Sequence, residues 1–140
     1  MTRKAVIQSH LEALMQDMLD VEELMVTDNG RVLVSTDIGS YTVRICPTCD
    51  NPHIEVFSIA VRNVTADPGL YEALNDLNRG MSHCRVFWHD DSVIVAGELL
   101  GESADKRSLR CLCDEIAHVA DHHGPRLAGI FGGETGEEND

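Results

Sequence analysis

Two cysteines and a histidine are the residues in this sequence best suited to chemistry. Cys46 and Cys49 are separated by two residues, and His53 follows four positions later. Two thiolates and an imidazole on one turn are ligands that zinc prefers, so a zinc site is one interpretation. A structural zinc ion usually takes four ligands, however, and the sequence has no second Cys-x-x-Cys pair. Pro47 and Pro52 favour the other interpretation, a plain turn between paired strands that carries reduced cysteines.

A second pair of imidazoles, His118 and His122, lies four residues apart on a predicted helix. This spacing can place two histidines on one metal ion. The intervening sequence, HVADH, lacks the glutamate that acts as the base in zinc proteases of the HExxH type. Histidines near a helix C-terminus are also favoured by the helix dipole alone. We therefore expect these two histidines to lie on a solvated helix face.

Enzyme motifs are not found in the sequence. It contains no nucleophile elbow, phosphate-binding loop or dinucleotide fingerprint. The glycines Gly129, Gly132 and Gly133 follow a predicted helix, whereas the glycines of a phosphate loop follow a strand. The carboxylates are scattered over positions typical of a solvated surface. We therefore expect a protein that is not an enzyme.

The acidic composition limits the classes of partner. The 140 residues carry a formal net charge of -13, whereas nucleic acids and anionic membranes favour basic surfaces, so we expect neither as a partner. No apolar run reaches the roughly 18 residues of a transmembrane helix, and the N-terminus lacks the apolar core of a signal peptide. We therefore expect a cytoplasmic, bacterial-type location. Five cysteines is an odd number, and a chain of this length can build a core, so we expect reduced thiols.

Hydrophobic periodicity and turn signals predict the element order α-β-β-β-α-β-β-α. The first helix is expected at about 3–20, with Thr2 as its N-cap. The second is expected at 67–80, where Asp67 and Pro68 begin the helix and Gly80 ends it in a left-handed conformation. The third is expected to begin at the N-cap Ser103 and to end at Gly124-Pro125. The strands are expected at 31–35, entered from a turn at 28–30, and at 41–46, 53–62, 84–89 and 92–100. The strand at 53–62 is apolar on both faces, with Ile54, Val56 and Ala60 opposite Phe57, Ile59 and Val61.

Strands joined by short turns favour an antiparallel sheet with helices packed on it, which is an α+β design. The length fits one domain, which we place at residues 1–133. Residues 134–140 are acidic and contain no apolar side chain, so they are predicted to be a disordered tail.

The hairpin formed by the last two strands is the centre of the second half of the chain. With Asp90-Asp91 as a two-residue loop, Phe87 lies opposite Ile94 and Val86 lies opposite Val95. Alternation then gives a core-like face with Cys84, Val86, Trp88, Val93, Val95 and Gly97. The opposite face of the hairpin carries both polar and apolar side chains. We expect helices to cover the first face and a partner to contact the second through Arg85, Phe87, His89, Ile94 and Ala96.

Three short strings in the second half carry a family resemblance. They are YEALNDLNRG at 71–80, the hairpin RVFWHDDSVIVAGEL at 85–99, and GIFGG at 129–133 after the last helix. In this order and spacing the chain resembles the YbjN-like branch of the superfamily that includes type III secretion chaperones. The resemblance implies a compact domain of the predicted element order, commonly a homodimer, without catalytic residues. In the secretion chaperones it implies binding of an extended client segment, and in YbjN-like proteins a role in regulation.

The first hypothesis is therefore a non-enzymatic, chaperone-like domain that binds a protein or peptide client as a homodimer and needs no cofactor. The asparagines of the LNDLN string are expected to bond nearby backbone groups rather than a ligand. The alternative hypothesis is a small zinc-binding regulatory protein that uses Cys46, Cys49 and His53, a turn that is not part of the family pattern.

Overall fold

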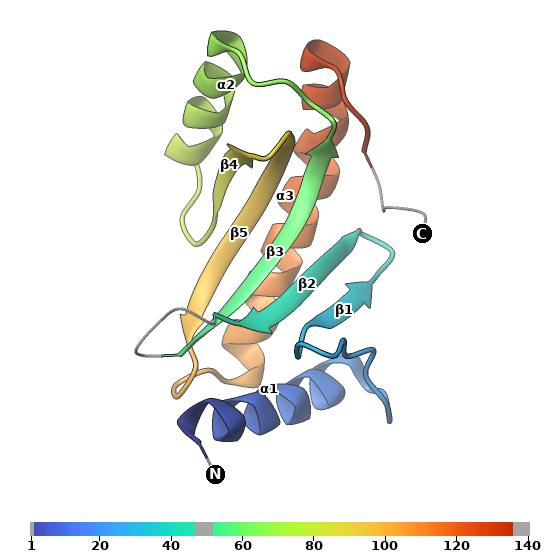
Figure 1. Ribbon diagram of the computed structural model, residues 1–140, viewed down its shortest axis with the longest axis vertical. Coiled ribbons are helices and arrows are strands. Elements are labelled where there is room, and N and C mark those ends of the chain that lie inside the picture. Colours follow the sequence, from blue (N-terminus) through green and yellow to red (C-terminus); the bar gives the residue numbers. More distant parts are fainter. Residues whose placement is uncertain (1, 47–51, 136–140) are drawn as a thin grey trace.

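The computed structural model describes residues 2–46 and 52–135, and there it contains a five-stranded sheet and three helices (Figure 1). The elements are α1 (Arg3–Leu19), β1 (Val32–Ser35), β2 (Ser40–Ile45), β3 (His53–Arg62), α2 (Pro68–Arg79), β4 (Arg85–His89), β5 (Ser92–Leu100) and α3 (Lys106–Phe131). The predicted α+β class and the order α-β-β-β-α-β-β-α are confirmed. Within the described residues, no helix is both long and apolar enough to cross a lipid bilayer.

The sheet has the strand order β1-β2-β3-β5-β4, and all its neighbouring strands are antiparallel. The β4–β5 hairpin has the predicted register, with Phe87 opposite Ile94. Its loop residues Asp90 and Asp91 both have positive φ angles, 51° and 61°. Positive φ at both loop positions is the geometry of a type I′ turn, whose twist matches that of the two strands.

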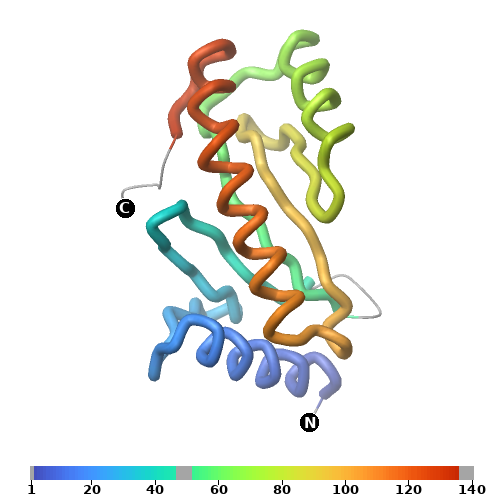
Figure 2. The backbone as a smooth tube through the Cα atoms, turned by 180° about the vertical axis from the view of Figure 1, so that it is seen from behind, coloured from blue at the N-terminus to red at the C-terminus, as the bar shows by residue number. Residues whose placement is uncertain are grey.

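Helix α3 lies along one face of the sheet, as the two opposite views show (Figures 1 and 2). Val93 and Val95 of β5 are buried on this face. A Cβ added to Gly97 would come within 2.8 Å of Leu112 on α3, so the absence of a side chain there allows the helix to pack closely. In the described part of the chain, no helix covers the other face of the sheet (Figure 1). The prediction that helices cover only the core-like face of the hairpin is confirmed.

Helices α1 and α2 begin as the sequence predicts. The Thr2 hydroxyl accepts a hydrogen bond from the Ala5 amide at 3.1 Å, and the Asp67 carboxylate accepts one from the Leu70 amide at 2.8 Å. Each bond satisfies an amide that has no partner inside the first turn of the helix. Gly80 closes α2 with φ of −97°, so the predicted left-handed cap is wrong. Its amide instead bonds the Leu77 carbonyl at 3.1 Å in a tight right-handed turn, which needs no positive φ.

Both predicted ends of α3 are wrong. The N-cap is Asp105 rather than Ser103, because Asp105 and Ser108 form a reciprocal capping box with bonds of 2.8 and 3.2 Å. The helix also continues through Pro125 to Phe131. A proline inside a helix costs about 3 kcal/mol, a cost that tertiary packing offsets here by burying Leu127 beyond the proline.

The structure differs from the predicted pattern at two further places, in strand β3 and at the start of the predicted tail. A register shift between Ile59 and Val61 of β3 places both Ala60 and Val61 in the core, although strict alternation predicts opposite faces for them. The second difference concerns residue 134, the first residue of the predicted disordered tail, which is paired with a strand. Glu134 forms an antiparallel bridge with Arg62, in which each amide donates to the other residue's carbonyl at 2.8 Å. Residues 136–140 of the predicted tail lie outside the described residues.

Candidate partner-binding surfaces

An apolar patch occupies the centre of the sheet face that none of the three described helices covers. Cross-strand pairing brings Phe57 of β3 opposite Ala96 of β5, and it brings Ile59 and Phe87 to either side of Ile94. We call these five residues, on three adjacent strands, the open-face patch. Ile59 is 42% exposed, and Phe57, Phe87 and Ile94 are half-buried. An exposed apolar patch on a protein surface is typical of a site that contacts another molecule.

The five residues predicted to bind a partner do lie on this open face, but they are not equally accessible. Arg85 and His89 are exposed, and Phe87 and Ile94 are half-buried. Ala96 is only 1% exposed, so its prediction as a contact residue is wrong. The short alanine side chain lies between longer cross-strand neighbours, which cover it. The sequence interpretation also missed Phe57 and Ile59, because it considered only the hairpin and not the strand that pairs with it.

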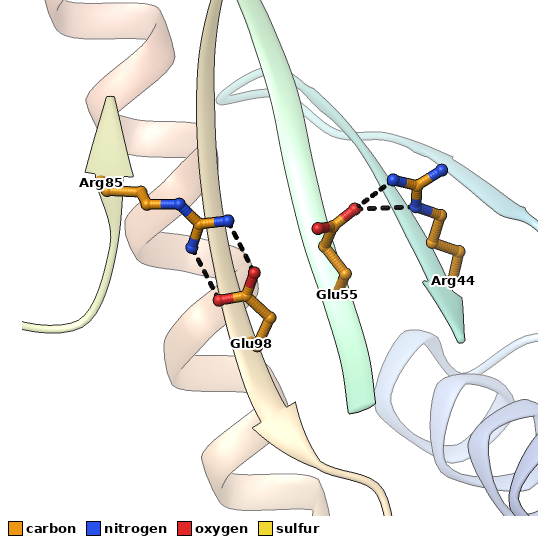
Figure 3. Close-up of polar contacts among 4 residues, drawn as sticks. All are labelled: Arg44, Glu55, Arg85 and Glu98. Atoms are coloured by element: carbon orange, nitrogen blue, oxygen red, sulfur yellow. Dashed lines mark hydrogen bonds and ion pairs between the residues drawn. The ribbon is translucent and has the colours of Figure 1, made fainter. Parts of the chain in front are cut away.

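Two arginine–glutamate pairs lie beside the open-face patch (Figure 3). Arg85 forms a bidentate pair with Glu98, with both N–O distances 2.7 Å, and Arg44 contacts Glu55 through two nitrogens, also at 2.7 Å. Glu55 and Glu98 are cross-strand partners, so each arginine offsets the repulsion between the two carboxylates. The hydrogen bonds from Arg85 hold the pKa of Glu98 below its usual value.

The same arginines cover the two phenylalanines of the patch. The guanidinium carbon of Arg44 lies 5.2 Å from the ring centre of Phe57, and that of Arg85 lies 5.6 Å from the ring centre of Phe87. Both distances fall in the range of cation–π attraction. The open face therefore combines apolar side chains with two cations and two anions, and its local net charge is close to zero.

The free edge of β4 is closed by a side chain of α2. The Asn78 amide oxygen accepts a hydrogen bond from the Val86 amide at 2.8 Å, and the Asn78 amide nitrogen donates to the Val86 carbonyl at 2.9 Å. Exposed strand edges pair readily with other chains, and this contact occupies the two backbone groups of Val86 at that edge. The expected backbone-bonding role is confirmed for this asparagine of the LNDLN string.

A groove opens where β1, β2, β3 and α3 meet. Its cavity has a volume of about 800 Å³. Four of the exposed large apolar side chains of the protein line it: Met25 (70% exposed), Leu33 (42%), Ile38 (42%) and Ile59 (42%). Asp37 and Asp121 add carboxylates to the lining, and Arg62 adds a guanidinium group. We call this feature the β3 groove. The sequence interpretation missed it, because Met25 and Ile38 lie in connecting segments whose position depends on the tertiary structure.

The predicted zinc ligands are only partly described. The Cys46 amide donates to the His53 carbonyl at 2.8 Å, so β2 and β3 bring these two residues opposite each other. Nδ1 of His53 is buried without a hydrogen-bond partner in residues 2–46 and 52–135. Cys49 lies outside the described residues. Within the described chain, no group of three or more histidine, cysteine or carboxylate side chains could hold a metal ion, and a site with Cys49 stays a prediction.

The histidines and cysteines of the second half lie as expected. His118 and His122 are exposed on α3, with parallel rings whose centres are 6.2 Å apart. Cys113 is fully buried in the core, and Cys84, Cys111 and Cys113 are free thiols. Burial raises the pKa of Cys113 to about 12, and burial together with Glu115 raises the pKa of Cys84 to about 11. A high pKa leaves little thiolate at neutral pH, so neither thiol is a reactive nucleophile.

The described chain is thus a small α+β domain with an apolar patch on the sheet face opposite α3 and a groove beside it. The sequence profile of one family, "T3SS (YopN, CesT) and YbjN peptide-binding chaperone 1" (TY-Chap1), matches residues 5–139. The chain therefore belongs to this family, and the resemblance seen in the LNDLN helix, the hairpin and the GIFGG string is confirmed. No curated protein matches the sequence significantly.

Two crystal structures of complexes contain chains with a similar fold. In the structure of the ExsC–ExsE complex, the matching chain has a TM-score of 0.68 and 12% sequence identity, over 91% of this chain and 97% of that chain. In the structure of the Yersinia pestis type III secretion chaperone SycH with a stable fragment of YscM2, the matching chain has a TM-score of 0.59 and 18% identity, over 81% of this chain and 96% of that chain. At these identities the similarity establishes the shared fold.

Proposed function

We propose that this protein is a non-enzymatic, cytoplasmic chaperone that binds a segment of a client protein and acts as a homodimer. The observation that carries the proposal is the open-face patch, a set of apolar side chains that no helix of the described chain covers. Apolar side chains that stay in water do not stabilise a monomer. Burying them against a partner is favourable, because the hydrophobic effect favours removal of apolar surface from water. Membership of a peptide-binding chaperone family supports a client, and the composition of the face supports a second copy.

The open face suits self-association because its charges are self-complementary. A two-fold dimer places the same surface of each protomer against the other, so every cation must meet an anion of the same surface. Arg44 and Arg85 stand beside Glu55 and Glu98 around an apolar centre, and this arrangement meets that requirement. The overall charge of -13 opposes association of two copies, but the repulsion is weakest where the local charge is balanced.

Light scattering of the purified protein at micromolar concentration tests the dimer. We expect a dimer for the wild type and a monomer for Ile94→Asp, which places an unpaired carboxylate in the patch. Ile130→Asp is the matched control, because Ile130 is 72% exposed and lies outside the patch and the groove, and we expect it to stay dimeric. Far-UV circular dichroism shows whether each variant is folded. A wild-type monomer, or a folded Ile94→Asp dimer, contradicts the proposed interface.

The client is tested separately. The immobilised protein is incubated with the cytosol in which it occurs, captured proteins are identified, and each candidate is purified and mixed with the chaperone. We expect one candidate to co-elute with the protein as a stable complex in size-exclusion chromatography. If no purified candidate forms such a complex, the chaperone function is wrong.

A zinc-binding regulatory function remains the second candidate, because Cys46 lies opposite His53 and the buried Nδ1 of His53 has no hydrogen-bond partner in the described chain. Elemental analysis of the purified protein, followed by a thermal melt with and without chelator, tests this function. Stoichiometric zinc whose removal lowers the melting temperature would support a site with Cys49. A metal-free protein whose stability does not respond to chelator would eliminate it.

A further inference from the structure

Two sulfur atoms and a carboxylate converge on the face of the sheet that α3 covers. The Sγ atom of Cys84 lies 3.8 Å from Sδ of Met81 and 3.7 Å from Oε1 of Glu115. Met81 and Cys84 belong to the segment that joins α2 to β4, residues 80–84, and Glu115 belongs to α3. All three side chains are half-buried. We call these three residues the sulfur cluster.

The segment that carries the two sulfur atoms is fixed at three points. The Asn78 carbonyl accepts a hydrogen bond from the Met81 amide at 3.2 Å, and the Asn78 side chain bonds both backbone groups of Val86. Between these points the segment passes close to β5, because Gly97 has no side chain. A Cβ added to Gly97 would lie 2.9 Å from the His83 carbonyl oxygen. The two sulfur atoms are therefore attached to a backbone that is held in place, as a metal site requires.

Glu115 gives the cluster a negative charge that no described basic side chain neutralises. The ion pairs of the described chain use other carboxylates. Burial and the charge of Glu115 raise the pKa of Cys84 to about 11, so the thiol keeps its proton at neutral pH. This single proton can be donated to Met81 or to Glu115, but not to both. A cation in place of the proton would contact all three groups at once.

The spacing of the three donor atoms fits one metal ion between them. With metal–sulfur bonds of about 2.3 Å, the two sulfurs 3.8 Å apart subtend an angle of roughly 110° at a shared metal. With a metal–oxygen bond of about 2.1 Å, the 3.7 Å between Sγ of Cys84 and Oε1 of Glu115 corresponds to roughly 115°. Both angles lie in the range of tetrahedral and trigonal coordination. These two distances therefore need not change when a metal ion binds.

The types of ligand select a soft metal ion. Thiolate and thioether sulfur favour Cu(I), whereas structural zinc sites use four groups of the cysteine, histidine and carboxylate kinds. Only two groups of the sulfur cluster are of those kinds, and the third is the thioether of Met81. Exchange of the thiol proton for Cu(I) also leaves the net charge of the cluster unchanged, because each is a monovalent cation.

We propose that Met81, Cys84 and Glu115 form a binding site for Cu(I). The S–H bond of Cys84 breaks, an S–Cu bond forms and the proton passes to solvent, while neither copper nor sulfur changes its oxidation state. The Met81 thioether and the Glu115 carboxylate complete the coordination. The inference goes beyond the proposed function. It requires neither a client nor a second copy of the chain, so its failure and the failure of the chaperone proposal are separate results.

An anaerobic titration of Cu(I) against the chromogenic chelator bicinchoninate tests the site. Cys46 and Cys49 are a second pair of thiols suited to soft metals, so the reference protein is Cys46→Ser/Cys49→Ser. We expect it to remove about one equivalent of Cu(I) from the chelator, as a site of this ligand set requires. Near-ultraviolet absorption from charge transfer between thiolate and Cu(I) should appear at the same time. In the wild-type background, Cys84→Ser should bind about one equivalent less than the protein with Cys84 intact.

Variants of the reference protein test the two sulfur ligands. Cys84→Ser should abolish both binding and the absorption, whereas its control Cys111→Ser, which removes an exposed thiol of α3, should change neither. Met81→Leu keeps the size and apolar character of the side chain. It should weaken Cu(I) binding at least about tenfold, the usual cost of losing even a hydrogen-bond partner of a metal ligand. Met25→Leu removes a thioether that is 70% exposed elsewhere, and it should bind like the reference protein.

The carboxylate is tested by a pair of variants with the same change of charge. Glu115→Gln keeps the shape of the side chain and should weaken Cu(I) binding about tenfold. Asp114→Asn removes a negative charge from an exposed neighbour on α3 and should bind Cu(I) like the reference protein. Equal affinities of these two variants would show that Glu115 is not a ligand. Far-UV circular dichroism shows whether each variant is folded.

The inference is overturned if the folded reference protein removes no Cu(I) from the chelator, or if Cys84→Ser binds Cu(I) equally well. Equal affinities of Met81→Leu and Met25→Leu also overturn it, because the thioether is then not a ligand. X-ray absorption of the copper-loaded protein is the second measurement, with two sulfur neighbours of copper expected in the reference protein and one in Met81→Leu. A zinc affinity equal to that for Cu(I) would show that the choice of metal is wrong.

Discussion

The side-chain amide of Asn78 on α2 hydrogen-bonds both backbone groups of Val86 on β4, at 2.8 and 2.9 Å. Asn78 thereby takes the place of a neighbouring strand at the outer edge of the sheet. The contact explains why an asparagine, a poor residue for a helix interior, lies in the last turn of α2. It also occupies the two backbone groups of Val86 at the free edge of β4, whereas the described chain leaves the open-face patch and the β3 groove uncovered.

We expect Asn78→Ala to lower the free energy of unfolding by about 1–2 kcal/mol, because two backbone groups of Val86 lose their partners. Urea denaturation followed by circular dichroism measures the change. Asn75→Ala is the matched control, because Asn75 is exposed on the same helix, and alanine is the better helix former. Its stability should equal or slightly exceed that of the wild type. Equal stability of both variants would show that the Asn78 contact contributes nothing.

Gly124 is expected to be intolerant of any side chain. A Cβ at this position would lie 2.6 Å from the Ala60 carbonyl, so Gly124→Ala must separate α3 from β3. The expected destabilisation is about 1–3 kcal/mol, as for other overpacked sites. Gly129→Ala in the same helix provides the contrast, because nothing lies within 4 Å of its added Cβ. That variant should gain about 0.5–1 kcal/mol from helix propensity, and thermal melts compare the two.

The Arg85–Glu98 pair should make stability depend on pH in the acidic range. The folded-state pKa of Glu98 is lowered by hydrogen bonds from Arg85, so the pair stabilises the fold above the usual glutamate value of 4.5. This contribution is lost as the pH falls below that value and through the lowered folded-state pKa. We therefore expect Glu98→Gln to be less stable than wild type at pH 7, with the difference shrinking towards pH 3. A difference that is constant over this range would contradict the role of the pair.

The described cysteines of the second half should differ in reactivity. Cys111 is exposed, whereas the pKa values of Cys84 and Cys113 are raised to about 11 and about 12. At pH 8, iodoacetamide should therefore modify Cys111 well before the other two, which peptide mass spectrometry resolves. In denaturant all three should react at similar rates. Rapid modification of Cys113 in the folded protein would show that α3 opens.

Local sequence signals determined most of the secondary structure. Thr2 and Asp67 start their helices because each cap is a contact between residues three positions apart. The β4–β5 register follows from the two-residue Asp90-Asp91 loop, which leaves the strands one pairing. The family resemblance likewise depends on short strings of consecutive residues. These features depend on neighbours along the chain, so the sequence contains them directly.

Only the tertiary structure decided which surfaces are available to a partner. Pro125 should end a helix, yet α3 continues because burial of Leu127 against the rest of the core outweighs the lost hydrogen bond. Ala96 has the position of a surface residue in the strand pattern, but its cross-strand neighbours cover it. The β3 groove exists because the β1–β2 hairpin diverges from β3, and it combines segments that are far apart in the sequence. Burial and cavities result from packing between distant elements, and no periodicity along the chain encodes them.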